Sequence, residues 1–117
     1  MQELQVNKEN CFSVLMAVYK KEQPLFFKEA LRSVFEQSLI PNEVVLVKDG
    51  PLTEELEQII VDFSSKNEQL KVITLEKNQG LGEALRIGLN ACSFDLVARM
   101  DSDDICKPYR FEKQIAF

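Results

Sequence analysis

Residues 94–104 have the sequence FDLVARMDSDD, in which an apolar run leads directly into three carboxylates within four positions. So much negative charge at one chain reversal is unfavourable unless a cation or solvent relieves it. Asp101 and Asp103 can turn toward one divalent ion while Ser102 turns away, since Mg²⁺ typically takes one or two carboxylates together with substrate phosphates. The alternative is a solvated acidic turn. An EF-hand loop is excluded, because Ile105 stands where that loop needs an oxygen ligand.

Length and composition narrow the classes of protein that this chain can belong to. The 117 residues, 45% of them apolar, fit one domain with a core. The net charge of -5 argues against a protein that grips nucleic acid, and the absence of histidine excludes histidine-based catalysis. The odd number of cysteines makes a poor disulfide framework. No apolar run approaches the length of a membrane span, and the polar first ten residues are no signal peptide.

Upstream of the acidic stretch, apolar runs alternate with helical patterns along the whole chain. Strands are expected at Phe12–Tyr19, Glu43–Lys48, Leu70–Leu75 and Phe94–Met100. Helices are expected at Pro24–Ser38, from the N-cap Thr53 to about Asn67, at Glu83–Ala91, and from Pro108 onward. This alternation favours a parallel sheet with right-handed crossovers. We therefore predict an α/β fold, an open three-layer sandwich with a mainly parallel sheet, over residues 11–117, after a flexible leader at residues 1–10.

Helical spacing also predicts which apolar side chains face the sheet. The expected inward positions are Phe27, Leu31, Val34 and Phe35 in the first helix, Leu56, Ile59, Ile60 and Phe63 in the second, and Ala84, Leu85, Ile87 and Leu89 in the third. If all strands point the same way, their carboxyl ends meet at one edge of the sheet. Ligands of open α/β sheets bind at that edge, where the strand order reverses. Four polar or aromatic residues are expected there: Tyr19, Asn78, Asp49 and Asp101.

Two of these residues have side chains suited to a nucleotide. Asp49 would accept hydrogen bonds from a base or a ribose, or would simply form the turn with Gly50. Tyr19 would stack on a base, or would pack at the edge of the sheet.

The glycine-containing stretch GLGEAL, residues 80–85, has part of a dinucleotide-binding fingerprint. Leu85 occupies the third glycine position, so we expect a flexible loop whose N–H groups face the crevice. Four nearby cations would balance phosphate charge or would be solvated: Lys20, Lys21, Lys48 and Arg86.

Four blocks of sequence together resemble the nucleotide-sugar-dependent glycosyltransferases of family 2, which have the GT-A fold. They are FSVLMAVYK at residues 12–20, EVVLVKDG at 43–50, NQGLGEALRIGLNAC at 78–92 and ARMDSDDICKPYRFEKQ at 98–114. The resemblance runs from Phe12 to Phe117. The GLGEAL form resembles the branch that builds capsule, exopolysaccharide or lipopolysaccharide chains in bacteria.

The resemblance implies roles for individual residues in binding a nucleoside-diphosphate sugar of the UDP or GDP type. Tyr19 would stack on the donor base and Asp49 would hydrogen-bond it, with Ala17 at the donor site where the family often has Pro. Asp101 and Asp103 would be the Asp-x-Asp pair that binds Mg²⁺ or Mn²⁺, with Asp103 in direct contact. Asp104 is expected to turn toward the following loop. The metal would neutralise the departing diphosphate while the sugar passes to an acceptor hydroxyl with inversion.

The resemblance also sets expectations for the protein as a whole. The chain would be the donor-binding half of a glycosyltransferase domain, inactive or nearly so alone, with no catalytic residue of its own and a general base beyond residue 117. The location would be cytoplasmic, at most peripheral to the inner face of the membrane. Uncovered apolar surface makes a homodimer plausible.

Two other classes of protein compete with the glycosyltransferase as explanations of these residues. One is a metal-dependent nucleotidyltransferase, which should carry a glycine-rich loop after the first strand, where this chain has Lys20-Lys21-Glu22-Gln23. The other is a non-catalytic module for nucleotide binding or protein interaction.

Overall fold

The computed structural model describes residues 11–105 and 107–115, so the predicted leader and the last two residues lie outside it. The strands are β1 (Phe12–Val18), β2 (Glu43–Lys48), β3 (Leu70–Thr74) and β4 (Leu96–Asp101). The helices are α1 (Pro24–Phe35), α2 (Glu54–Lys66), α3 (Leu81–Ala91) and α4 (Arg110–Ile115). Strands and helices alternate as predicted. In this part of the chain, none of the helices combines the length and apolar content needed to cross a membrane.

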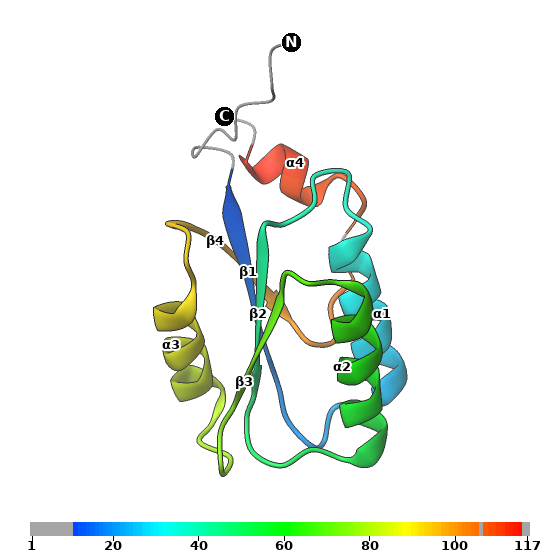
Figure 1. Cartoon of the computed structure of the whole chain (residues 1–117), viewed down its shortest axis with the longest axis vertical. Helices are drawn as coiled ribbons and strands as arrows, with labels where there is room; N and C mark the ends of the chain where they lie inside the picture. Colours follow the sequence, from blue (N-terminus) through cyan, green and yellow to red (C-terminus); the bar gives the residue numbers. More distant parts are fainter. Residues whose placement is uncertain (1–10, 106, 116–117) are drawn as a thin grey trace.

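The four strands form one parallel sheet in the order β3-β2-β1-β4. After β1 the chain winds outward through β2 and β3, and then returns to the other side of β1 as β4. The strand order therefore reverses between β1 and β4. Figure 1 shows α1 and α2 together on one face of the sheet and α3 on the other. The predicted α/β fold with three layers and a parallel sheet is confirmed.

Two apolar clusters fill the space on either side of the sheet. β1 is buried at all seven of its positions, because it is central and both of its faces are covered. Phe12, Val14, Met16 and Val18 pack toward α1 and α2, whereas Leu15 and Ala17 pack toward α3. This alternation follows from the two-residue period of a strand. The near-continuous apolar sequence of β1 is thus explained by its place in the sheet.

Helix α3 approaches the sheet through a glycine instead of a leucine. Leu89, which we expected to face inward, is 52% exposed, whereas Gly88 is buried. A Cβ atom added at Gly88 would lie 2.4 Å from Leu15 Cδ1 and 2.7 Å from Val47 Cγ2. The lack of a side chain at Gly88 lets α3 lie close to β1 and β2, and this close approach turns Leu89 away from the sheet.

Strand β4 is an edge strand in the described sheet. Its apolar sequence suggests burial, but from residue 98 onward its side chains alternate, with Ala98 and Met100 buried and Arg99 and Asp101 exposed. Ala98 and Met100 pack into the cluster beneath α1 and α2. The opposite face of β4 is less covered, because α3 packs mainly on β1 and β2.

Several predicted boundaries move by one to three residues. β1 and β3 each end one residue early, β4 starts at Leu96, α1 ends at Phe35, α3 starts at Leu81 and α4 starts at Arg110. Strand β2 and the N-cap Thr53, whose Oγ1 accepts from Leu56 N–H at 3.3 Å, are as predicted. α3 begins early because Gly80, with φ of +95°, ends the loop before it.

The amino ends of the strands are held together by one buried acid, Glu43. Its Oε1 accepts from Ser13 Oγ at 2.7 Å and from Ser93 N–H at 2.8 Å, and its Oε2 accepts from Ser93 Oγ at 2.9 Å and pairs with Lys71 Nζ at 3.0 Å. Burial alone would raise the pKa of Glu43, but the hydrogen bonds from Ser93, Ser13 and Lys71 outweigh burial and lower it to about 2. Glu43 therefore joins β1, β2, β3 and the segment before β4.

Candidate functional site

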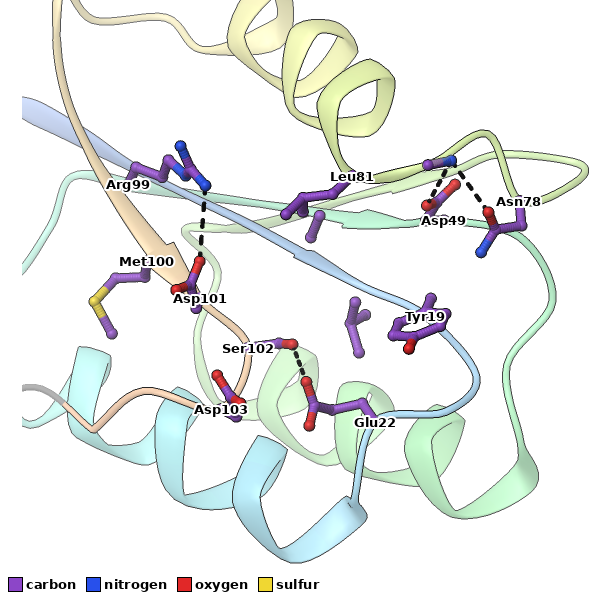
Figure 2. Close-up of a pocket in the computed structure, with 13 residues that line it drawn as sticks. Tyr19, Glu22, Asp49, Asn78, Leu81, Arg99, Met100, Asp101, Ser102 and Asp103 are labelled. Atoms are coloured by element: carbon purple, nitrogen blue, oxygen red, sulfur yellow. Dashed lines mark hydrogen bonds and ion pairs between the residues drawn. The ribbon is translucent and has the colours of Figure 1, made fainter.

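A cavity of about 470 Å³ opens at the carboxyl edge of the sheet. It lies where the strand order reverses, between the ends of β1 and β4, and extends to the end of β2 (Figure 2). All five residues predicted for the site line it: Ala17, Tyr19, Asp49, Asp101 and Asp103. Asn78, which we expected at this edge, lines it too. The parallel topology thus brings together side chains that are far apart in the sequence.

One wall of the cavity is formed by the end of β1. Ala17 is paired with Val47 of β2 on one side and with Asp101 of β4 on the other, so it lies at the floor between them. Tyr19 follows β1 and is 43% exposed, which leaves its ring available on the cavity side. The chain then turns sharply, because Glu22 N–H donates to the Tyr19 carbonyl oxygen at 3.0 Å.

Asp49 is 5% exposed and binds the loop before α3. Its Oδ1 accepts from Gln79 N–H at 2.7 Å. Its Oδ2 accepts from Gly80 N–H at 3.2 Å, a contact drawn as a dashed line in Figure 2. The loop N–H groups that we expected to face the crevice are therefore already used by Asp49. Each carboxylate oxygen can accept a second hydrogen bond, so Asp49 can shape the loop and still receive a donor from a ligand.

The close approach of this loop requires the glycine after Asp49. Gly50 has φ of +91°, and a Cβ atom added there would lie 2.6 Å from the backbone nitrogen of Asn78. A side chain at residue 50 would therefore clash with backbone and push the Asn78 loop away from the cavity. Gly50 thus helps to keep Asn78 at the cavity wall.

The acidic turn after β4 forms the opposite wall. Asp104 N–H donates to the Asp101 carbonyl oxygen at 3.1 Å, which closes the turn. Asp101, Asp103 and Asp104 are exposed, and each places a carboxylate oxygen within 4.8 Å of the other two. Asp104 therefore stays near the other two carboxylates, although it does not line the cavity. The closed turn carries residues 101 and 104 to the same side of the chain.

Ser102 is directed away from these carboxylates, as expected for the middle residue of Asp-x-Asp. It is 8% exposed, and its Oγ donates to a carboxylate oxygen of Glu22, which also lines the cavity (Figure 2). Sequence reasoning missed Glu22, because it stands in a polar stretch that is indistinguishable from an ordinary solvated loop.

Arg99 was also missed, and it lines the cavity beside the acidic turn. Its Nη2 lies 3.9 Å from Asp101 Oδ1 (Figure 2). Strand alternation was the available signal, because residues 99 and 101 must point to the same face. The cations that we singled out do not line the cavity: Lys48 pairs with Glu57 at 2.8 Å, Arg86 pairs with Glu83, and Lys20 and Lys21 are exposed.

The cavity is mostly acidic, so an anionic ligand would need a cation bound with it to offset the repulsion. Among the described residues that line it, four are acids and one, Arg99, is a cation. Three adjacent carboxylates offer the hard oxygen donors that Mg²⁺ and Mn²⁺ prefer. The donor set therefore fits the divalent ion that the sequence resemblance implies, and it leaves coordination positions for phosphate oxygens.

Comparison with known proteins gives consistent matches. The profile of "Glycosyl transferase family 2" matches residues 13–117. The "UDP-Gal:alpha-D-GlcNAc-diphosphoundecaprenol beta-1,3-galactosyltransferase" of Escherichia coli is 52% identical over 101 residues, which cover 86% of this chain and 36% of that protein. The "Amylovoran biosynthesis glycosyltransferase AmsE" of Erwinia amylovora is 47% identical over 106 residues, which cover 91% of this chain and 40% of that protein. The chain thus spans two fifths or less of the length of these two relatives.

Solved structures share the architecture. S. aureus TarS in complex with UDP-GlcNAc superposes with a TM-score of 0.78 at 31% identity, over 91% of this chain and 30% of that chain. A mannosyltransferase from Pyrobaculum calidifontis, in complex with GDP-Man and Mn2+, has a TM-score of 0.73 at 21% identity, over 90% of this chain and 30% of that chain, and shares the fold. The order of the elements, the parallel sheet and the family match agree with one another. The chain belongs to glycosyl transferase family 2.

Proposed function

We propose that this chain binds a nucleoside-diphosphate sugar and is the donor-binding part of a glycosyltransferase for bacterial surface polysaccharides. The observation that carries the proposal is a single cavity that joins Tyr19 and Asp49 to the acidic turn at the point where the strand order reverses. Its two ends differ in chemistry, as the two ends of such a donor do. One is aromatic and hydrogen-bonding, and the other is rich in carboxylates.

The base and ribose of the donor would occupy the end near β1 and β2. Tyr19 would stack on the base, because its ring is partly exposed at the cavity wall. Asp49 would accept a hydrogen bond from the base with a lone pair that Gln79 and Gly80 leave unused. Ala17, at the floor, has no large side chain to block the cavity.

The diphosphate would occupy the end near β4. Asp101 and Asp103, with Asp104 beside them, would hold Mg²⁺ or Mn²⁺. When bound, such an ion supplies Lewis-acid stabilisation of the departing nucleoside diphosphate. Arg99 would share the phosphate charge from the side of β4, because it is the cation among the described lining residues and its pairing with Asp101 is long and exposed.

The remaining parts of the reaction would lie outside this chain. We propose that residues 11–117 supply the donor half, and that the acceptor site and the general base correspond to the part of the relatives that the chain does not cover. The E. coli relative is named for an acceptor on a diphosphate lipid. If the acceptor hydroxyl is on such a lipid carrier, we propose that the sugar transfer takes place in the cytoplasm, at the inner face of the membrane.

Isothermal titration calorimetry tests donor binding directly. The chain is titrated with UDP and with GDP, each in the presence of Mn²⁺, of Mg²⁺ and of EDTA. We expect saturable binding of one nucleotide with a divalent ion and a large loss of affinity in EDTA. Tyr19→Ala should weaken binding with or without metal, because stacking is worth about 1–3 kcal/mol per base. No binding of either nucleotide with either ion would contradict the proposal.

A further inference from the structure

We infer that Glu22 is a positioning residue for the acidic turn, acting through Ser102. The inference rests on the proposed function, because it assigns to Glu22 the task of holding Asp101 and Asp103 where the metal and the diphosphate would bind. Glu22 itself makes no contact with the reacting atoms in this account. It sets the geometry of the groups that do.

The contact that supports this role joins two loops that are 80 residues apart in the sequence. Ser102 is buried between two exposed aspartates, and its hydroxyl donates to Glu22 Oε1 (Figure 2). Ser102 lies inside the turn that Asp104 N–H closes on the Asp101 carbonyl oxygen, so a hydrogen bond held at Ser102 restrains the residues on both sides of it. With Ser102 held by Glu22, the turn keeps Asp101 and Asp103 at the cavity that all four residues line.

Glu22 is held from its own side as well. Its Oε2 accepts from Gln23 N–H at 3.1 Å, and its N–H donates to the Tyr19 carbonyl oxygen at 3.0 Å. The same residue therefore belongs to the turn that positions Tyr19 and to the hydrogen bond that positions the acidic turn. Glu22 connects the end of the cavity assigned to the base with the end assigned to the metal.

The acidic turn needs such a tether because its charges oppose its closed form. Asp101, Asp103 and Asp104 carry like charges within 4.8 Å of one another, and these charges repel when no ion lies between them. Without the hydrogen bond to Ser102, the turn would relax outward and binding an ion would require it to reorder. Residues that orient metal ligands commonly change metal affinity about 10- to 100-fold when they are replaced.

Two conservative variants separate the tether from a simple charge effect. Glu22→Gln keeps the reach and an acceptor oxygen for Ser102 but removes the charge. Glu22→Asp keeps the charge but shortens the side chain, so it no longer reaches Ser102. If Glu22 acts by position, Gln should preserve metal affinity better than Asp, and the reverse order would overturn the inference.

The full experiment compares Glu22→Ala, Ser102→Ala and the double variant in the 117-residue chain. Mn²⁺ binding is followed by the loss of the free-ion signal in electron paramagnetic resonance, and UDP or GDP binding by calorimetry with Mn²⁺. Each single variant should weaken Mn²⁺-dependent binding about tenfold, and the double variant should be no weaker than either single. Additive losses, or no loss, would overturn the inference.

Ser38→Ala is the matched control. Ser38 Oγ also donates to a glutamate far along the chain, Glu112 Oε1 at 2.6 Å, but neither residue lines the cavity. This variant should leave Mn²⁺ affinity unchanged.

Amide hydrogen exchange distinguishes failure of the tether from failure of the proposed function. If the wild-type chain binds no nucleotide, the proposed function fails, and exchange at Asp104 N–H still tests the tether, because this N–H closes the turn. Faster exchange in Glu22→Ala and Ser102→Ala, but not in Ser38→Ala, would support the tether. Unchanged exchange in all three would overturn it.

Discussion

The two ends of the sheet both carry acids, and they use them in opposite ways. At the amino ends of the strands, Glu43 is buried and its oxygens are occupied by donors from Ser13, Ser93 and Lys71. At the carboxyl ends, Asp101 and Asp103 are exposed beside a cavity and face other carboxylates. The first arrangement uses all of its acceptor capacity within the protein. The second leaves its carboxylate oxygens available to accept from a ligand or to bind an ion.

This difference separates an end of the sheet that stabilises the fold from an end where we propose that a ligand binds. The hydrogen bonds that lower the pKa of buried Glu43 favour its charged form in the folded chain, and this preference stabilises the native state. Exposed like charges within 4.8 Å of one another contribute nothing favourable without a cation. Asp49 lies between these extremes, because it is buried and binds the Asn78 loop but keeps acceptor capacity for a ligand.

The largest effect on stability is expected from Glu43→Ala. The substitution leaves the buried hydroxyl of Ser13 and the N–H of Ser93 without their acceptor, which should lower the free energy of unfolding by about 3–4 kcal/mol. Urea denaturation followed by circular dichroism measures the change. Glu36→Ala is the control, since Glu36 is exposed and pairs only loosely with Arg32 at 3.4 Å. An equal loss of free energy of unfolding in the two variants would contradict the stabilising role of Glu43 at the amino ends of the strands.

Lowering the pH should remove the contribution of Glu43 to stability without a mutation. Glu43 has a pKa of about 2 in the folded chain against 4.5 as its ordinary value, so its contribution is complete above about pH 4.5. That contribution is lost as the pH falls toward 2, because the unfolded chain then binds a proton that the folded chain does not. The loss should approach about 3 kcal/mol. Urea titrations at a series of pH values give the slope, which should be flatter in Glu43→Gln. An identical slope in both chains would assign the acid sensitivity to other groups.

A smaller effect, confined to ligand binding, is expected from Arg99→Ala. Loss of this cation should weaken UDP binding about tenfold, but should leave uridine binding nearly unchanged, because uridine has no phosphate. Competition calorimetry with the two ligands measures the ratio. Arg86→Ala is the control, because Arg86 pairs with Glu83 and does not line the cavity. An equal loss for UDP and uridine would show that Arg99 only supports Asp101.

The carboxyl-end side of this contrast could be predicted from sequence, whereas the role of Glu43 was not predicted. The predicted bounds of strand β2 agree with the structure at both ends, because its apolar run is bounded by Asn42 and by Asp49-Gly50-Pro51. The meeting of Tyr19, Asp49 and Asp101 at one cavity follows from parallel topology alone. The alternation of strands and helices along the chain was sufficient to predict that these residues meet at one edge of the sheet.

What could not be predicted depends on contacts between loops and on backbone proximity. The hydrogen bond of Glu22 with Ser102 is invisible in sequence, because either residue alone is an ordinary loop residue. Leu89 was assigned inward from the helical spacing of apolar residues, whereas the close packing of α3 selects Gly88 for that face. This error concerns a position where geometry overrides the preference of the residue type.

The most direct test is to measure stability and metal-dependent nucleotide binding in Asp103→Asn. The variant removes one charge from the acidic turn and keeps the shape of the side chain. We expect its free energy of unfolding to stay within about 0.5 kcal/mol of the wild type, because Asp103 is exposed. We expect its Mn²⁺-dependent affinity for UDP or GDP to fall about 100-fold. Unchanged affinity, or a loss of stability comparable to that of Glu43→Ala, would contradict the assignment of this end of the sheet to metal and donor binding.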